Sequence, residues 1–241
     1  MEGLHNIESI GGVLSVSDAP NLISFTGLRG LTSLGSKLSV IQNAALVNFE
    51  GLEGLTSLAN QTYIEDNLAL KNFEGLENVT GIDDLYVTGC NELTSMQGLH
   101  GLKSAGTITL TWLEKLTSLS GFGNSIESPG YLKLAYNSKL SDLSGIFSAE
   151  GKLNGSLSLN DNGYITSLDG LSFNPIVEDI FIVNNLYLGD LTALSDVVII
   201  DQELQVFFCL TISSLAKRNL ELPKPASSEL ASRAGCKGCT R

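Results

Sequence analysis

The chain lacks the short motifs that mark most enzyme sites. Its 2 histidines, His5 and His100, have no nucleophile pattern around them, and no G-x-S-x-G, H-E-x-x-H or P-loop sequence occurs. The D-x-D-x-D-G loop that binds calcium is also missing. We therefore expect a non-enzymatic protein with no catalytic residue, no cofactor and no bound metal.

Positive charge and long apolar runs are also scarce. The 241 residues have a formal net charge of −12. Before Ala216 there are 8 basic and 24 acidic residues, a balance of −16, whereas the rest of the chain has 6 basic and 2 acidic residues. An acidic body disfavours nucleic acid and anionic membrane surfaces as partners. No apolar run approaches the roughly 18 residues that cross a bilayer, so we expect no direct membrane insertion.

What fills the chain instead is one internal repeat. The segment KLSVIQNAALVNFEGLEGLTSL, residues 37–58, returns downstream with the same kinds of residue in the same slots. We take the slot of Asn43 as the corner of each repeat. Corners recur every 23 to 25 residues, at Ala19, Asn43, Asn67, Cys90, Leu113, Asn137, Asn162, Asn185 and Cys209. A fixed period of this length indicates a stacked solenoid.

The residues before each corner predict a strand. Apolar residues stand five and three positions before the corner, as in Leu38/Val40. The exception is Thr62/Ile64, in which a polar residue takes the first position. Alternation with a period of two is typical of a short strand with one buried face.

The residues after each corner predict a return path. One residue in three is apolar there, as in Leu46, Phe49 and Leu52, which suits a bent, non-helical segment. A column of glycines that includes Gly51 and Gly75 predicts positive φ or a close approach of stacked backbones.

Together these patterns predict an all-β protein, a right-handed parallel β-solenoid of about nine turns of 23–25 residues. We expect the solenoid to span residues 1–215 and a basic, disordered tail to span 216–241. The first residues superpose on the middle of a repeat, with Met1 in the slot of Met96. The chain can therefore be a piece of a longer protein, and the missing signal peptide then says nothing about its compartment.

The corner residues predict a structural ladder. A turn leaves backbone N–H and C=O groups without partners, and a buried side-chain amide can bridge them from one turn to the next. Cysteine is small and tolerates burial, so it fits the same slot. We expect this ladder at Asn43, Asn67, Cys90, Asn137, Asn162, Asn185 and Cys209.

The pattern Leu-x-[Ile/Val/Leu]-x-x-Asn-x-x-Leu-x-x-[Leu/Phe]-x-Gly-Leu resembles leucine-rich repeats. It is closer to the receptor L-domain variant, found in the ectodomains of insulin- and EGF-receptor-like proteins. The first buried Leu lies three residues after the corner, at Leu46, Leu70 and Leu93. The resemblance covers about residues 3–215 and implies a cell-surface or extracellular location. It is specific for fold but weak for function, because such repeats bind many unrelated partners.

The tail contains Cys236-Lys-Gly-Cys239. This pair lacks the second pair of a zinc site and the βαβ context of a redox motif. Because receptor L-domains are often followed by cysteine-rich modules, the resemblance implies that these are the first cysteines of such a module. An inert disordered tail is the alternative.

Outward strand positions collect aromatic residues in the middle repeats. We expect a ligand-binding cluster there, formed by Tyr63, Tyr86, Trp112 and Tyr136. Aromatic residues mixed with carboxylates on an exposed sheet are typical of interface hot spots. The alternative interpretation is that these rings stack along the strand ladder only for stability.

Three N-x-[ST] sequons are candidates for glycosylation, at Asn60, Asn78 and Asn154. All three asparagines are expected in the segment of variable length before the strands, from which a glycan could project.

The hypothesis that accounts best for these patterns is a recognition module that binds a protein or glycan. The alternatives are a structural or adhesive repeat spacer, an intracellular scaffold, and a β-helix polysaccharide hydrolase using Asp66 or Asp84. A glycosidase of that kind needs two carboxylates about 5–9.5 Å apart. The sequence leaves the ligand and the oligomeric state open.

Overall fold

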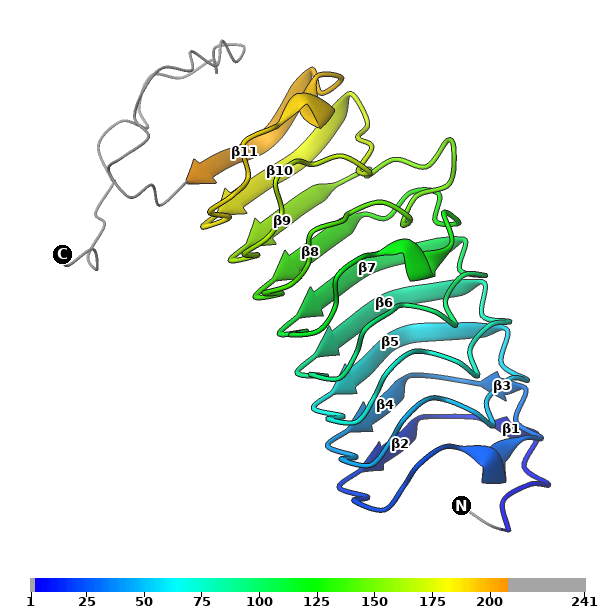
Figure 1. The fold of residues 1–241 in the computed structure, drawn as a ribbon. Coiled ribbons are helices and arrows are strands. Elements are labelled where there is room, and N and C mark those ends of the chain that lie inside the picture. The colour runs from blue at the N-terminus through cyan, green and yellow to red at the C-terminus, as the bar shows by residue number, and fades with distance from the viewer. Residues whose placement is uncertain (1–2, 208–241) are drawn as a thin grey trace, which may run out of the picture. The chain divides into compact units, whose positions relative to one another are not determined.

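The computed structural model of the chain describes residues 3–207. One extended stack of strands dominates this part of the chain (Figure 1). The strands are β1 (Ser9–Ile10), β2 (Leu14–Ser17), β3 (Ser33–Leu34), β4 (Leu38–Ile41), β5 (Ser57–Glu65), β6 (Gly81–Thr88), β7 (Ser104–Thr111), β8 (Tyr131–Ala135), β9 (Ser156–Asn160), β10 (Ile176–Val183) and β11 (Ile199–Phe207).

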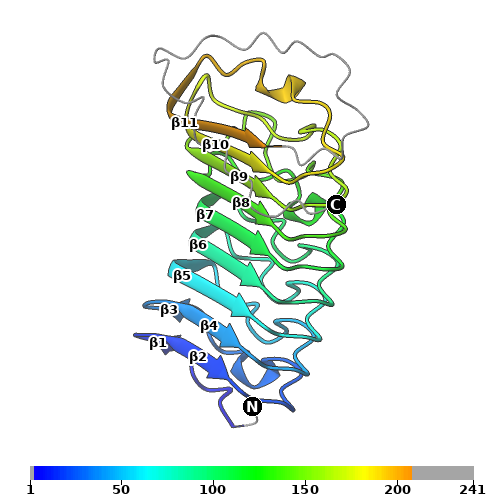
Figure 2. The same cartoon turned by 90° about the vertical axis from the view of Figure 1, so that its left-hand side faces the viewer.

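Nine of these strands form one parallel sheet, in the order β11-β10-β9-β8-β7-β6-β5-β4-β2. Each strand pairs with the equivalent strand of the next repeat, so each repeat is one turn, or rung, of a solenoid. We number the rungs by their corners, from rung 1 at Ala19 to rung 8 at Asn185. The strands all run in one direction and end along one edge of the stack (Figure 2). The predicted all-β parallel solenoid is confirmed.

The register of the sheet follows the repeat. Leu38 pairs with Thr62 and Val40 pairs with Ile64. The inward residues Leu38, Val40 and Ile64 are fully buried, as the alternation of apolar residues predicts. Several strands begin earlier than expected, because their upstream residues also pair across a local irregularity, for example between Leu58 and Gln61 of β5.

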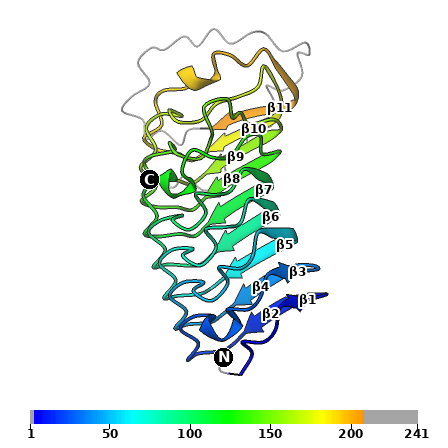
Figure 3. The same ribbon diagram turned by 90° about the vertical axis from the view of Figure 1, so that its right-hand side faces the viewer.

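The return segments of successive rungs lie one above another and close the core (Figure 3). Phe25, Phe49 and Phe73 occupy the same slot in three rungs, and their rings stack with centroids 5.8 and 5.5 Å apart. The return segments were expected to be non-helical, but three of them contain a single 3-10 turn. These turns are η1 (Thr26–Leu28), η2 (Ser120–Phe122) and η3 (Thr192–Leu194).

Several members of the glycine column meet both predicted requirements. Gly51, Gly75 and Gly98 have φ of 106°, 104° and 100°. A Cβ atom on Gly75 would also overlap the backbone carbonyl of Phe49 in the preceding rung. These positions exclude other residues for two independent reasons, conformation and space.

Contacts between residues divide the chain after Cys209, into units of residues 1–209 and 210–241. The predicted boundary between 215 and 216 lies outside the described residues. Cys209 and the Cys236/Cys239 pair also lie outside them.

Candidate functional site

The corner asparagines join the rungs through their side-chain amides. The Oδ1 atom of Asn162 accepts a hydrogen bond from the backbone N–H of Asn137 at 3.1 Å, and its Nδ2 donates to the carbonyl of Leu134 at 2.8 Å. The amides of Asn43, Asn67, Asn137 and Asn185 bridge their neighbouring rungs in the same way. These asparagines are fully buried, and their role is to hold the edge on which the site lies.

Cys90 occupies a corner as a buried thiol. Its Sγ contacts the carbonyl oxygen of Ile64 at 3.8 Å, which replaces one bond of the ladder. Burial raises the pKa of the Cys90 thiol to about 12, an effect that hydrogen bonds with Asn67 only partly counteract. A thiol in this state is a poor nucleophile and a poor metal ligand, so Cys90 belongs to the structure of the solenoid.

The residue before each described corner has a left-handed backbone. This left-handed column consists of Asp18, Gln42, Asp66, Gly89, Trp112, Tyr136, Asp161 and Asn184, with φ between 52° and 66°. Glycine, asparagine and aspartate tolerate this conformation, whereas bulky side chains rarely adopt it. Trp112 at 58° and Tyr136 at 59° are therefore outliers in the column.

The two outliers contact each other. The rings of Trp112 and Tyr136 stack with their centroids 4.3 Å apart and their planes 11° from parallel. Although they are stacked, Trp112 remains 53% exposed and Tyr136 43% exposed. Stacking of this kind contributes about 0.5–1.5 kcal/mol for the pair, which is less than the combined cost of two strained backbones at about 1–3 kcal/mol each.

Tyr63 and Tyr86 form a second stacked pair on the outward face of the sheet. They are partners in the β5–β6 register, with ring centroids 4.9 Å apart, and both are half-buried. The Nζ atom of Lys37 lies 5.5 Å from the Tyr63 ring centroid. Burial, the Asp84 carboxylate and Tyr63 raise the pKa of Tyr86, in that order of size.

The four aromatic residues expected at the site thus form two pairs in two different columns. Tyr63 and Tyr86 lie four residues before their corners, whereas Trp112 and Tyr136 lie directly before theirs. Stacking is observed within each pair. In the described part of the chain, no ring contact joins one pair to the other.

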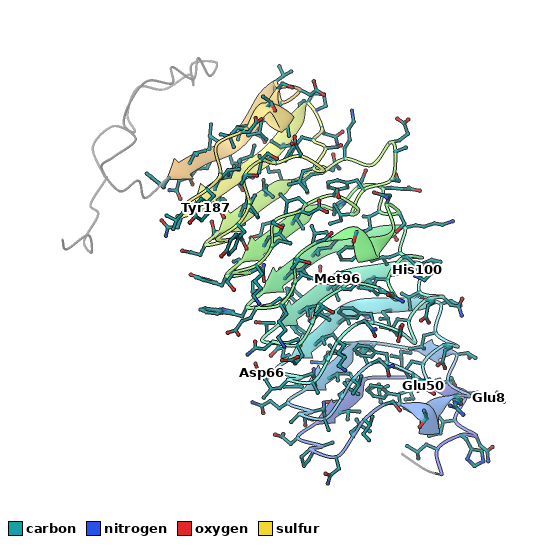
Figure 4. The ribbon with its side chains drawn as sticks, in the orientation of Figure 1. Glu8, Glu50, Asp66, Met96, His100 and Tyr187 are labelled. Atoms are coloured by element: carbon teal, nitrogen blue, oxygen red, sulfur yellow. The ribbon has the colours of Figure 1, made fainter. Side chains whose placement is uncertain are left out.

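A third stacked pair was not expected from the sequence. Tyr164 and Tyr187 lie two residues after the corners of rungs 7 and 8, with ring centroids 6.1 Å apart. They are 60% and 64% exposed. Figure 4 shows Tyr187 and Asp66 on the same edge of the stack, where the strands end. The repetition of Tyr in one slot of two consecutive repeats was the available signal.

We call this border the strand-end edge. It consists of the left-handed column and the two residues that follow each corner. Its C-terminal half carries several exposed aromatic and aliphatic side chains: Trp112, Tyr136, Tyr164, Leu186 and Tyr187. Contiguous patches of exposed apolar side chains are typical of interaction surfaces, whereas single ones are normal on any protein.

A concave surface lies among the return segments, apart from the strand-end edge. A hollow of about 390 Å³ is lined by Glu50, Glu53, Glu74, Glu77, His100 and three neighbours. Figure 4 places Glu50 and His100 away from the strand-end edge.

The carboxylates of this hollow are already engaged. Those of Glu53 and Glu77 accept hydrogen bonds from the backbone N–H groups of Gly51 and Gly75. Glu50 pairs with Arg29 at 3.0 Å. Among residues 3–207, no group of three or more His, Cys, Asp or Glu side chains is placed to hold a metal ion.

The carboxylates considered for a hydrolase do not form a pair. Asp84 pairs with Gln61 of the neighbouring strand in the β5–β6 register. Gln61 lies five residues before Asp66, so Asp84 and Asp66 are separated by five positions along the strand direction. This offset corresponds to roughly 16 Å along the strand, beyond the 5–9.5 Å that a glycosidase requires. Asp83 is engaged elsewhere, since its Oδ2 accepts a hydrogen bond from the backbone N–H of Asn60 at 2.7 Å.

The sequons differ in their surroundings. Asn78 and Asn154 are exposed and lie outside the strands, as expected. The expectation that Asn60 lies in a loop is wrong, because Asn60 lies within β5 at a bulge with φ of 62°. The bulge keeps the Asn60 side chain exposed despite the strand pairing on both sides.

Comparison with known proteins gives no match: no family model, no curated protein and no solved structure is significantly similar to this chain. Within residues 3–207, no helix has the length and apolar character needed to cross a membrane.

Proposed function

We propose that the chain is a non-enzymatic recognition module of the receptor L-domain type, in which a leucine-rich solenoid presents a surface for a protein or glycan ligand. The strand-end edge and the adjoining sheet face form this surface, with Trp112 and Tyr136 as its main contacts and Tyr63 and Tyr86 beside them. The resemblance of the repeat favours the outer part of a cell-surface or secreted protein.

The observation that carries this proposal is the backbone of Trp112 and Tyr136. Both have positive φ in a column whose other members are mostly Asp, Asn and Gly. Backbone strain that is retained on an exposed surface is typical of functional positions. Large amphipathic rings held rigidly in solvent are also the side chains that dominate binding energy at interfaces.

The test separates binding from stability. The double variant Trp112→Asn/Tyr136→Asn keeps residues that tolerate positive φ and removes both rings. Because relief of strain at two residues at least offsets the loss of one stacking contact, we do not expect the free energy of unfolding to fall by more than about 1 kcal/mol. We expect binding to its targets on arrays of purified extracellular proteins and glycans to be lost.

The matched control is Ile23→Asn, which removes an apolar side chain that is 63% exposed on a return segment. Binding should survive this change. If the double variant binds every target as well as the unchanged chain does, the recognition surface is wrong. A structural or adhesive spacer would then account better for the repeats.

A further inference from the structure

The left-handed column has a gap directly before its aromatic pair. Gly89 is the member of rung 4, and it places no side chain between Asp66 of rung 3 and Trp112 of rung 5. Rungs are spaced by about 4.8 Å, so the backbones of Asp66 and Trp112 lie roughly 10 Å apart. The strands keep register here, because Thr88 and Thr111 pair and their hydroxyls lie 2.9 Å apart.

One aromatic face of the pair borders this gap. Tyr136 covers the face of Trp112 that points toward rung 6. The opposite face points toward Gly89, which has no side chain to cover it. A Cβ built on Gly89 would have atoms of Asp66 as its three nearest neighbours, each nearer than any atom of Trp112.

A carboxylate reaches into the gap from the side of rung 3. The Oδ1 atom of Asp66 lies where the Gly89 side chain would begin, so the carboxylate leans toward Trp112. In the described part of the chain, no hydrogen bond or ion pair engages this carboxylate. The equivalent carboxylate of Asp161 does have a partner, since it accepts a hydrogen bond from Asn184 Nδ2 at 3.1 Å.

The surrounding charge is negative. Residues 44–137, which span both sides of the gap, contain 4 basic and 11 acidic side chains. The nearby cation Lys115 is paired with Glu92 at 2.6 Å and is therefore not directed at Asp66. The field around the gap attracts a cation and repels an anion.

We propose that the gap over Gly89 receives an arginine side chain of a partner protein. The guanidinium stacks on the free face of Trp112 and donates hydrogen bonds to the carboxylate of Asp66. A planar cation is the group that satisfies an indole face and a carboxylate together. Because Asp66 Oδ1 lies at the level of Gly89, one rung from Trp112, a guanidinium at that level can stack on the indole at about 3.5–4 Å and donate sideways to the carboxylate at about 2.8 Å. This inference rests on the proposed function and names its ligand chemistry.

The probe is a hexa-arginine peptide, with hexa-citrulline as its neutral isostere, titrated into the full chain. Trp112 is the single tryptophan of the 241 residues, so its fluorescence reports on the gap alone. We expect a saturable change with the arginine peptide, weaker at higher salt, and no change with citrulline.

Two variants test the position. Asp66→Asn removes the charge, and Gly89→Asn fills the gap with a residue that tolerates positive φ. Each should weaken binding of hexa-arginine at least about tenfold. The control is Asp161→Asn, which removes a carboxylate from the same column, and it should leave binding unchanged. Equal weakening in all three variants, or no fluorescence change at all, overturns the proposal.

A failure of the arginine site can be told apart from a failure of the proposed recognition function. If an array target loses binding with Trp112→Asn but not with Asp66→Asn or Gly89→Asn, recognition stands and the arginine site is wrong. The same holds if the target is a glycan. If hexa-arginine binds as expected while Trp112→Asn changes no array binding, the arginine site stands and the recognition surface is wrong.

Discussion

The Oδ1 atom of Asn185 accepts a hydrogen bond from the backbone N–H of Asn162 at 3.0 Å, across a separation of 23 residues. The amide of Asn162 repeats the arrangement one rung earlier. Each asparagine therefore satisfies a backbone group of its neighbour that is buried and has no water to bind. The ladder is a series of hydrogen bonds between neighbouring rungs. Removing one of its asparagines should lower the free energy of unfolding.

Asn162→Ala should destabilise the solenoid strongly. The change leaves the backbone N–H of Asn137 without its partner in the core and removes one hydrogen bond to the carbonyl of Leu134. A buried unsatisfied N–H predicts a loss of about 1–3 kcal/mol, measured by urea unfolding. Asn174→Ala is the control, because Asn174 is only half-buried and its side-chain amide donates to Asn154 Oδ1 in an exposed hydrogen bond. A loss below about 1 kcal/mol for Asn162→Ala would contradict the role of the ladder.

Gly75→Ala should be among the most damaging single-atom additions. The new Cβ meets the carbonyl of Phe49, and alanine disfavours φ of 104°. We expect a loss of about 3 kcal/mol or more, seen as a lower midpoint of urea unfolding. Gly189→Ala should cost less than about 1 kcal/mol, because the nearest atom to its Cβ, Tyr187 O, lies 4.0 Å away. Similar losses in the two variants would show that the close approach is tolerated.

Thr62→Val should stabilise the protein. Thr62 is 1% exposed, and its hydroxyl has no hydrogen-bond partner in the described part of the chain. Valine has the same shape and no group to desolvate, so the free energy of unfolding should rise by about 1 kcal/mol. The outward-facing Thr107→Val is the control, expected within about 0.5 kcal/mol of no change. A decrease with Thr62→Val would mean that the hydroxyl has a partner, such as a buried water.

Cys90 should make stability depend on alkaline pH. Its folded pKa of about 12 lies above the ordinary value of 9.0. Above pH 9 the unfolded chain loses the thiol proton while the folded chain retains it, so stability falls as pH rises from 9 toward 12. Unfolding in urea at pH 7, 8, 9 and 10 checks this.

The comparison is with Cys90→Ala, which keeps every other titrating group. The loss should approach about 1.4 kcal/mol per pH unit in the unchanged chain relative to this variant. Parallel pH profiles for the two chains would show that the thiol is not held neutral by burial.

The repeat itself could be predicted from the sequence, because its signals are local and recur. The corner asparagines, the inward strand pairs and the glycine column each follow from one residue type in one slot. The upstream extensions of the strands could not be predicted, since their residues lack the alternation. They pair only because Ser57 and Gly81 lie side by side in successive rungs.

The candidate site was only partly visible in the sequence. The four aromatic residues could be named, but their division into two pairs depends on register and on the turn at the corner. Positive φ at Trp112 runs against the conformational preference of tryptophan, so no rule of propensity would have placed it there. The importance of Gly89 depends on the neighbouring rungs, because it follows from the face of Trp112 that no side chain covers.

The ladder also bears on how such a chain can change over time. Its bonds join residues 23 to 28 positions apart and reach no further than the adjacent rungs. A duplication or deletion of one whole unit would therefore leave every remaining bond with an equivalent partner. The number of turns is free to drift by unequal exchange between copies of the repeat, whereas a shift of a few residues would break the ladder at once. Selection can thus alter the number of repeats readily, but it must preserve the spacing of residues within each repeat.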